Sequence, residues 1–210
     1  MIILRQKSYS VFGRVVGKFI DKRRKENDET RATLDSLESV DKEERRKLLG
    51  KLYGKLKRSG VGKSKGLDYE FDPTQGSNGA IITTQGGLRD NPILIAHEAG
   101  HSENWKTNAG RRRINTSLET PARWDYIQEK QVTGKTPPLK KALTTALKTG
   151  KQRLTQVREE SKANKNGLRL LKESGAAKKT LDLARKTYKL QKKTYRNNAL
   201  TEILEPLKNY

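Results

Sequence analysis

Cysteine is absent from the 210 residues of this sequence, and histidine occurs only twice. Without cysteine, disulfide bonds and thiolate metal sites are excluded, so imidazole and carboxylate groups must hold any bound metal. Long apolar runs are also missing: no stretch approaches the roughly 20 apolar residues that span a bilayer. The N-terminus has too short an apolar run for a signal peptide. We therefore expect no transmembrane segment and a cytoplasmic location.

Apolar residues in general are scarce, at 32% of the chain, while charged residues make up 33%. This balance predicts a modest core and a large surface. Lysine and arginine number 46 against 24 acidic residues, which gives a net charge of +22. Such a chain attracts polyanions, whether nucleic acid, anionic lipid or an acidic protein. Aromatic residues are only 6%, and no nucleic-acid recognition motif is present, so the charge alone does not choose among these partners.

The apolar residues that do occur recur at helical intervals over much of the chain. Residues 9–20 predict a basic amphipathic helix, which packs on the protein's own core or lies on a membrane. Asp41, followed three residues later by Glu44, predicts the start of a second helix. Asn91 as N-cap, with Pro92 in the first helical position, predicts a third helix that ends near Trp105.

The second half of the chain is expected to be helical as well. A helix begins after residues 115–117 and is stopped by Gly134 and the proline pair at 137–138. From residue 139 to the end, leucine stripes predict antiparallel helices with basic outer faces, broken at Gly167 and Ser174-Gly175. Two short segments differ: residues 67–71 alternate, and residues 80–84 are β-branched, with turn residues between them, so they predict a hairpin.

The fold expected from these patterns is mainly α with a small β-hairpin or sheet. We divide the chain into an N-terminal helical segment (residues 1–60), a core (residues 61–134) and a basic helical C-terminal region (residues 135–210), which packs on the core or extends from it.

Both histidines belong to one motif, His97-Glu98-Ala99-Gly100-His101, on the helix predicted to begin at Pro92. Histidines four residues apart project from one helix face and can reach a single ion, and neutral imidazole binds Zn²⁺ at about 2.0–2.1 Å. Glu98 lies beside the metal, where it can take a proton from a zinc-bound water and deliver it to the leaving amine. Random placement would produce this arrangement with a probability on the order of one in a thousand.

A catalytic zinc site needs a third protein ligand, and with no third histidine it must be a carboxylate. Glu103 is too close in sequence and turned off the histidine face. Glu119 lies eighteen residues after His101, at the start of the next predicted helix, and is the favoured ligand. Asp125 stays open as the alternative, as in aspartate-type zincins, although the rest of their signature is missing.

Residues 80–127 resemble the minimal gluzincins, including the ImmA/IrrE-type peptidases of mobile elements. They also resemble, more faintly, the neutral zinc metallopeptidases of the YugP type, whose membrane segments this chain lacks. Glu119 and Ala122 match the Glu-x-x-Ala step of gluzincins, where a small residue lets two helices approach. The resemblance implies a core of strand, HExxH helix and Glu-bearing helix with basic helical extensions, one zinc per chain, and hydrolysis of peptide bonds in a protein or peptide substrate.

Further residues around the motif are candidates for contacts with the substrate or the core. The segment before the active helix occupies the place where zincins pair with an extended substrate. Arg123, Tyr126 and Tyr69 are candidate hydrogen-bond donors to the transition state, whereas Trp105 and Trp124 are interpreted as packing residues. The substrate-binding strand consists of Ala80, Ile81, Ile82, Thr83 and Thr84.

A second hypothesis follows from the charge. The opening residues MIILRQKSYS are similar to those of small phage-encoded proteins, and a basic protein suits a particle that carries DNA. The chain would then be a nucleic-acid-associated structural protein, virion-associated rather than simply cytoplasmic, with phage structural proteins as partners and a degenerate or merely stabilising metal site. The two hypotheses are compatible, since basic helices can deliver a protease core to DNA or to a capsid.

Overall fold

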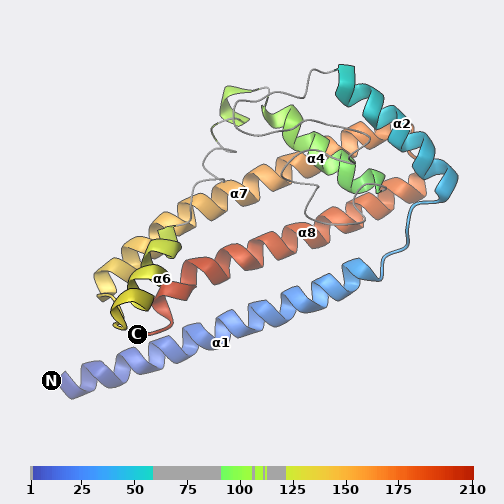
Figure 1. Cartoon of the computed structure of the whole chain (residues 1–210). Helices are drawn as coiled ribbons and strands as arrows, with labels where there is room; N and C mark the ends of the chain where they lie inside the picture. Colours follow the sequence, from blue (N-terminus) through green and yellow to red (C-terminus); the bar gives the residue numbers. More distant parts are fainter. Residues whose placement is uncertain (1, 59–90, 106, 111, 113–121) are drawn as a thin grey trace. The chain divides into compact units, whose positions relative to one another are not determined.

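The computed structural model describes residues 2–58, 91–105, 107–110, 112 and 122–210, and its regular structure within these ranges is helical. None of the described helices is both long enough and apolar enough to cross a membrane. The helices labelled in Figure 1 are α1 (Ile2–Asp35), α2 (Lys42–Arg58), α4 (Pro92–Trp105), α6 (Ala122–Thr133), α7 (Leu139–Glu173) and α8 (Lys178–Leu204). A short 3₁₀ helix, η2 (Glu205–Leu207), follows α8.

The mainly helical expectation is confirmed, but the zincin core with a strand or hairpin is wrong: no strand occurs in the part of the chain that the structure describes. The physical reason is that apolar residues in these ranges repeat at the helical period, so burial comes from packing helix on helix. The two predicted strands, residues 67–71 and 80–84, lie outside the described residues. This includes the candidate residues Tyr69, Ala80, Ile81, Ile82, Thr83 and Thr84.

Two predicted helix starts are confirmed by their caps. The Asp41 Oδ1 atom accepts a hydrogen bond from the Glu44 backbone N–H at 3.2 Å, at the start of α2. The Asn91 Oδ1 atom accepts one from the Ile93 backbone N–H at 3.0 Å, and Pro92 takes the first position of α4. Each cap satisfies a backbone donor that the first helical turn leaves unpaired. The helix that carries the two histidines therefore begins where its sequence specifies.

The break predicted at Ser174-Gly175 is confirmed, whereas the one predicted at Gly167 is wrong. Gly175 has φ +79° and ends α7 in the left-handed region that glycine adopts without strain. Gly167 lies inside α7, where a Cβ atom would come 2.9 Å from the Ala96 carbonyl oxygen of α4. This glycine is needed for a close approach between two helices, and the helix continues through it.

The chain divides into two compact units. The first unit contains residues 1–35, 112–158 and 190–210; the second contains residues 36–111 and 159–189. Helices α7 and α8 contribute one part to each unit. All residues of the candidate site described below belong to the second unit.

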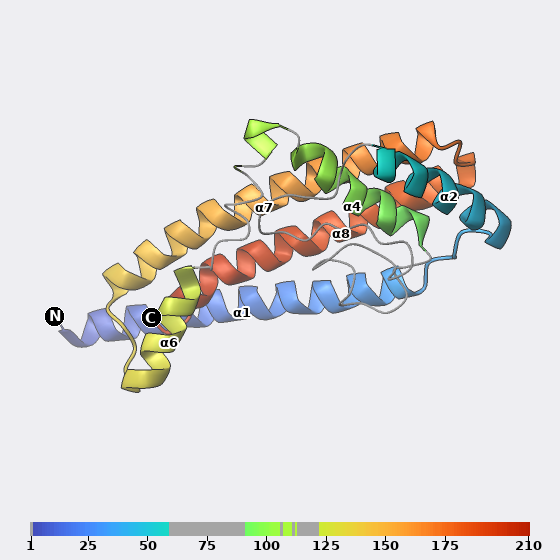
Figure 2. The same ribbon diagram turned by 45° about the horizontal axis from the view of Figure 1, so that its top comes forward.

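In the first unit, α1 runs alongside the C-terminal part of α8, as Figures 1 and 2 both show. Asn27 on α1 donates a hydrogen bond to Asn198 on α8 at 2.6 Å. The C-terminus closes on α1, because the Gly13 backbone N–H donates to the Tyr210 carbonyl oxygen at 2.9 Å. The buried apolar cluster of this unit consists of Val16, Ile20, Tyr126, Ala142, Ala146 and Leu207.

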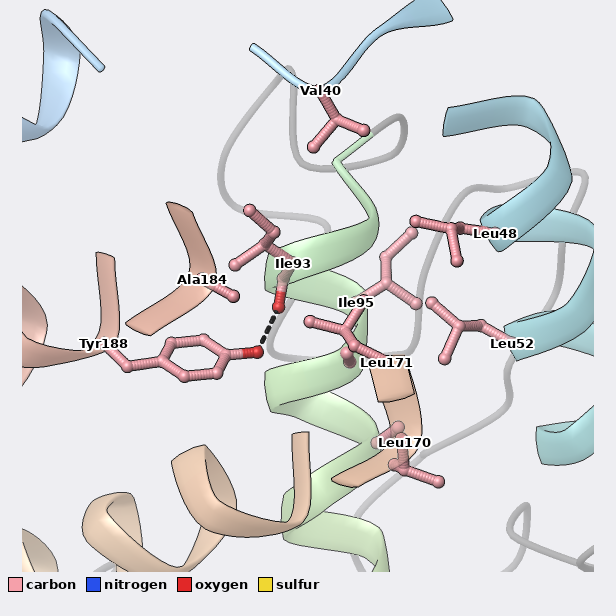
Figure 3. Packing of buried hydrophobic residues seen from close by; sticks show 11 residues of the cluster. Val40, Leu48, Leu52, Ile93, Ile95, Leu170, Leu171, Ala184 and Tyr188 are labelled. Carbon is pink, nitrogen blue, oxygen red and sulfur yellow. Dashed lines mark hydrogen bonds between the residues drawn. The ribbon is translucent and has the colours of Figure 1, made fainter. Parts of the chain in front are cut away.

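The core of the second unit surrounds α4, which packs against α2, α7 and α8 (Figure 3). Fully burying each of its large apolar side chains contributes on the order of 1.5–3 kcal/mol before entropic costs. The Tyr188 hydroxyl of α8 donates to the Ile93 carbonyl oxygen at 2.6 Å and so fixes the first turn of α4. The buried residues of the cluster are Val40, Leu48, Leu52, Ile93, Ile95, Ala96, Ala99, Leu170, Leu171, Ala184 and Tyr188.

Candidate metal centre

Small residues bring the backbones of α4 and α7 together beside the histidines. A Cβ atom on Gly100 would lie 2.2 Å from the carbonyl oxygen of Ala163, a distance that no real side chain tolerates. Four residues further along α7, Gly167 makes the equivalent approach to Ala96. Positions four apart lie on one helix face, so the two helices touch along a short line of small residues. The histidines on this face of α4 therefore reach the acidic side chains of α7.

Three ligand atoms meet at this contact: Nε2 of His97, Nε2 of His101 and Oε2 of Glu160. The two nitrogens are 3.3 Å apart. The Glu160 oxygen is 3.2 Å from the His97 nitrogen and 3.4 Å from the His101 nitrogen. A tetrahedral zinc ion with bonds of about 2.0–2.1 Å separates its ligand atoms by about 3.3 Å. The three atoms thus form the near-equilateral face that such an ion requires, and all three residues are buried.

The outer ring nitrogen of each histidine faces a different hydrogen-bond acceptor. Nδ1 of His97 is 2.8 Å from the Asn164 amide oxygen, and Nδ1 of His101 is 3.5 Å from a carboxylate oxygen of Glu159. An acceptor at Nδ1 places the ring proton there and leaves the Nε2 lone pair directed at the ligand triangle. In their neutral form, both histidines therefore favour the tautomer that binds a metal through Nε2.

Glu159 is itself anchored by Asn104, which Asn166 holds in turn. Its side chain is 2% exposed, and Oε1 accepts a hydrogen bond from the Asn104 amide at 2.5 Å. The Asn104 oxygen in turn accepts one from Asn166 at 2.9 Å. Burying a carboxylate is costly unless it is hydrogen-bonded or paired. These hydrogen bonds offset the cost of burying the carboxylate and fix Glu159 beside Nδ1 of His101.

The buried carboxylates and imidazoles shift one another's pKa values. Burial by itself opposes protonation of His101, but the neighbouring Glu159 and Glu160 raise its pKa well above the ordinary value. Burial disfavours the charged form of Glu160, yet the adjacent imidazoles of His101 and His97 outweigh it and lower the pKa of that carboxyl. The electrostatics of the centre consequently favour a positive charge between the acidic side chains of α7 and the histidines of α4.

Glu98 lies beside the ligand triangle and is not one of its corners. Its Oε1 atom is 3.9 Å from Nε2 of His97, and its Oε2 atom is buried without a hydrogen-bond partner among the described residues. Burial raises the pKa of this carboxyl, although both histidines act in the opposite direction. A buried oxygen with no partner, next to a potential metal position, is free to accept a proton from a reactant.

The structure offers a candidate third ligand, Glu160, that the sequence analysis did not name. Glu119, the favoured ligand, lies outside the described residues, and Asp125 is exposed on α6 in the first unit. A signal for Glu160 existed, because it forms with Ala163 the same Glu-x-x-Ala pattern that was read at Glu119. Here the small residue of the pattern is the one that meets Gly100.

The predicted transition-state donors of α6 are engaged elsewhere. Arg123 pairs with Glu202 at 3.3 Å, and the Tyr126 hydroxyl lies 3.3 Å from that of Tyr210. Burial and the Tyr210 hydroxyl raise the pKa of Tyr126. Trp124 is largely exposed, with the Arg123 guanidinium 5.3 Å from its ring centre. These contacts all lie within the first unit, whereas His97 belongs to the second.

No protein-family model, curated protein or solved structure matches this chain. The likeness to gluzincins therefore depends on the HExxH and Glu-x-x-Ala motifs alone.

Proposed function

We propose that the chain is a zinc-dependent metallopeptidase in which His97, His101 and Glu160 hold the ion and Glu98 is the general base. The observation that carries the proposal is the triangle of two imidazole nitrogens and one carboxylate oxygen with edges of 3.2–3.4 Å. Two histidines and a glutamate are the donor set of a classical group of zinc peptidases, and three protein ligands leave the fourth position open for the reaction. The imidazole and carboxylate ligands are well suited to zinc. Because the chain has no cysteine, a thiolate metal site is excluded.

Each residue then has a defined task. When bound, zinc supplies a Lewis acid that acidifies a water molecule and polarises the carbonyl of the scissile bond. Glu98 takes the proton of the attacking water on Oε2 and returns it to the leaving nitrogen. Asn164 and Glu159 hold the imidazole rings through their Nδ1 atoms, so both Nε2 lone pairs stay directed at the same point.

The first test separates the two candidate third ligands. Glu160→Gln should reduce bound zinc from one per chain to a small fraction, because an amide oxygen is a far weaker ligand than a carboxylate. Glu119→Gln is the matched control and should retain one zinc per chain. Elemental analysis after dialysis at equal protein concentration gives the answer. Full zinc in Glu160→Gln with loss in Glu119→Gln would reject the assignment of Glu160.

The second part of the test concerns catalysis. Glu98→Gln should keep its zinc and its helical circular dichroism but lose peptide hydrolysis by about two to four orders of magnitude, the usual cost of removing a general base. Cleavage of casein and of a mixed peptide library by the zinc-loaded chain provides the measurement. Activity within tenfold of the unsubstituted chain would show that Glu98 is not the base.

A structural zinc site is the second candidate, and the burial of all three ligands favours it. In that case the ion fastens α4 to α7 and no reaction follows. The same variants distinguish the two candidates: a zinc-loaded chain that cleaves no peptide, and whose stability falls with Glu160→Gln, would support the structural role.

A further inference from the structure

The part of α7 that belongs to the first unit is basic throughout. Residues 139–158 contain six lysine or arginine residues and no acidic residue. Two of the six are engaged within the unit, since Lys141 pairs with Glu129 and Arg153 with Glu202. The other four, Lys140, Lys148, Lys151 and Arg158, are exposed and form no ion pair within the described ranges. This twenty-residue segment therefore presents uncompensated positive charge.

Three leucines of the same segment are exposed as well. Leu143, Leu147 and Leu154 have 47%, 77% and 54% of their surface accessible. Single exposed leucines are common and need no explanation. These three lie at intervals of four and seven residues, so they form one row along the helix. The row is continued by basic residues three or four positions away, in the order Lys140, Leu143, Leu147, Lys151, Leu154, Arg158.

The opposite side of this segment is occupied by the unit's own core. Ala142 and Ala146 belong to the buried apolar cluster, and Thr145 and Thr149 of the same segment are buried as well. The helix is thus packed on one side and presents the leucine and lysine row on the other. We call the six residues of this row, together with Lys148, the α7 outer face.

We propose that the α7 outer face docks on a bilayer surface rich in anionic phospholipid. Leucines at the boundary between headgroups and acyl chains remove apolar surface from water, while lysine and arginine extend their charged ends to the phosphates. An acid-free segment adds attraction from each basic residue near a negatively charged leaflet. The absence of a membrane-crossing helix among the described residues agrees with this arrangement, in which the helix lies on the surface.

The leucines decide between a bilayer and nucleic acid. Contacts to the phosphate backbone need basic and polar groups only, and an exposed leucine row adds nothing to them. A surface bound to lipid uses both kinds of side chain at once. The convex outer face of a single helix suits a broad, flat partner such as a bilayer surface.

Vesicle flotation with the full-length chain tests the proposal. The chain should float with vesicles of 30% phosphatidylglycerol in phosphatidylcholine and stay behind with pure phosphatidylcholine. Leu147→Ser with Leu154→Ser should weaken binding to the anionic vesicles by about tenfold or more. Lys140→Gln, Lys151→Gln and Arg158→Gln together should weaken it similarly, with the remaining binding less sensitive to salt.

Matched substitutions control for general loss of apolar surface or charge. Val132→Ser removes an 86% exposed side chain from α6, and Lys172→Gln, Lys178→Gln and Lys189→Gln remove three exposed charges from the second unit. Both sets should bind vesicles nearly as the unsubstituted chain does, and circular dichroism checks that every variant is folded. The proposal is overturned by equal binding to neutral and anionic vesicles, by unchanged binding of the leucine variant, or by duplex DNA binding that alone responds to the basic substitutions.

Discussion

Glu159 supports the proposed metal centre without belonging to the HExxH motif, because it contacts the ligand His101 and would not contact the ion itself. Its carboxylate holds Nδ1 of His101 and is held by Asn104. We predict that Glu159→Ala lowers zinc affinity by about 10–100-fold, the usual effect of removing such an outer partner. Competition with a chromophoric chelator measures it.

A purely structural role for Glu159 would leave the ligand field unchanged, so a spectrum separates the two cases. The visible bands of the Co²⁺-loaded chain should shift in Glu159→Ala and return toward those of the original in Glu159→Gln, which keeps an acceptor oxygen. Glu173→Gln, at the exposed end of the same helix, is the control and should change neither affinity nor spectrum. Unaltered cobalt bands in Glu159→Ala, despite weaker binding, would mean that Glu159 does not position His101.

At this scale the sequence predicted the two histidines and Glu98 as one group, because helical spacing alone places them together. The carboxylate that completes the group could not be predicted in the same way. A Glu-x-x-Ala pattern occurs at both Glu119 and Glu160, and spacing along the chain does not say which later helix packs on α4. That choice depends on long-range contacts such as the approach of Gly100 to Ala163, which no local pattern encodes.

Among the elements, the contact of α4 with α7 decides whether the centre exists. We predict that Gly100→Ala destabilises the chain by about 1–3 kcal/mol, the range for overfilling a packed contact, because the new Cβ meets the backbone of Ala163. It should also release zinc, since the helices must separate. Denaturant unfolding and zinc content measure the two effects.

Gly50 of α2 provides the matched control for this substitution. A Cβ there meets nothing within 4 Å, so Gly50→Ala should leave stability unchanged or raise it by about 0.5–1 kcal/mol through better helix propensity. Equal behaviour of the two variants would mean that the line of small residues does not control how α4 packs on α7.

Helix starts were predictable from single residues, and helix continuations were not. Asp41 and Asn91 cap α2 and α4 as expected, because a side-chain oxygen beside free backbone N–H groups acts locally. Gly167 was predicted to break a helix, since glycine costs helical stability. Its role is instead to admit Ala96 of another helix, and only the packed structure reveals that need.

For the whole molecule, the division into two units predicts that zinc binding stabilises one unit and not the other. Each unit has its own buried cluster, and the proposed ligands all belong to the second. We predict that zinc at 100 times its dissociation constant stabilises the second unit by about 2.7 kcal/mol, which slows amide exchange in α4 about a hundredfold. Amides of α1 serve as the internal control and should exchange at an unchanged rate. Equal slowing in α1 and α4 would show that the chain unfolds as one body.

The distance between the histidines and Glu160 along the chain also orders events during synthesis. Glu160 follows His101 by 59 residues, which a ribosome adds in about 3–12 s at 5–20 residues per second. Throughout that interval the nascent chain carries both histidines but not yet the carboxylate of Glu160 on α7. On the proposed zinc site, metal loading is therefore a late step in the synthesis of the chain, and a product that ends before residue 160 should bind zinc more weakly than the full-length chain.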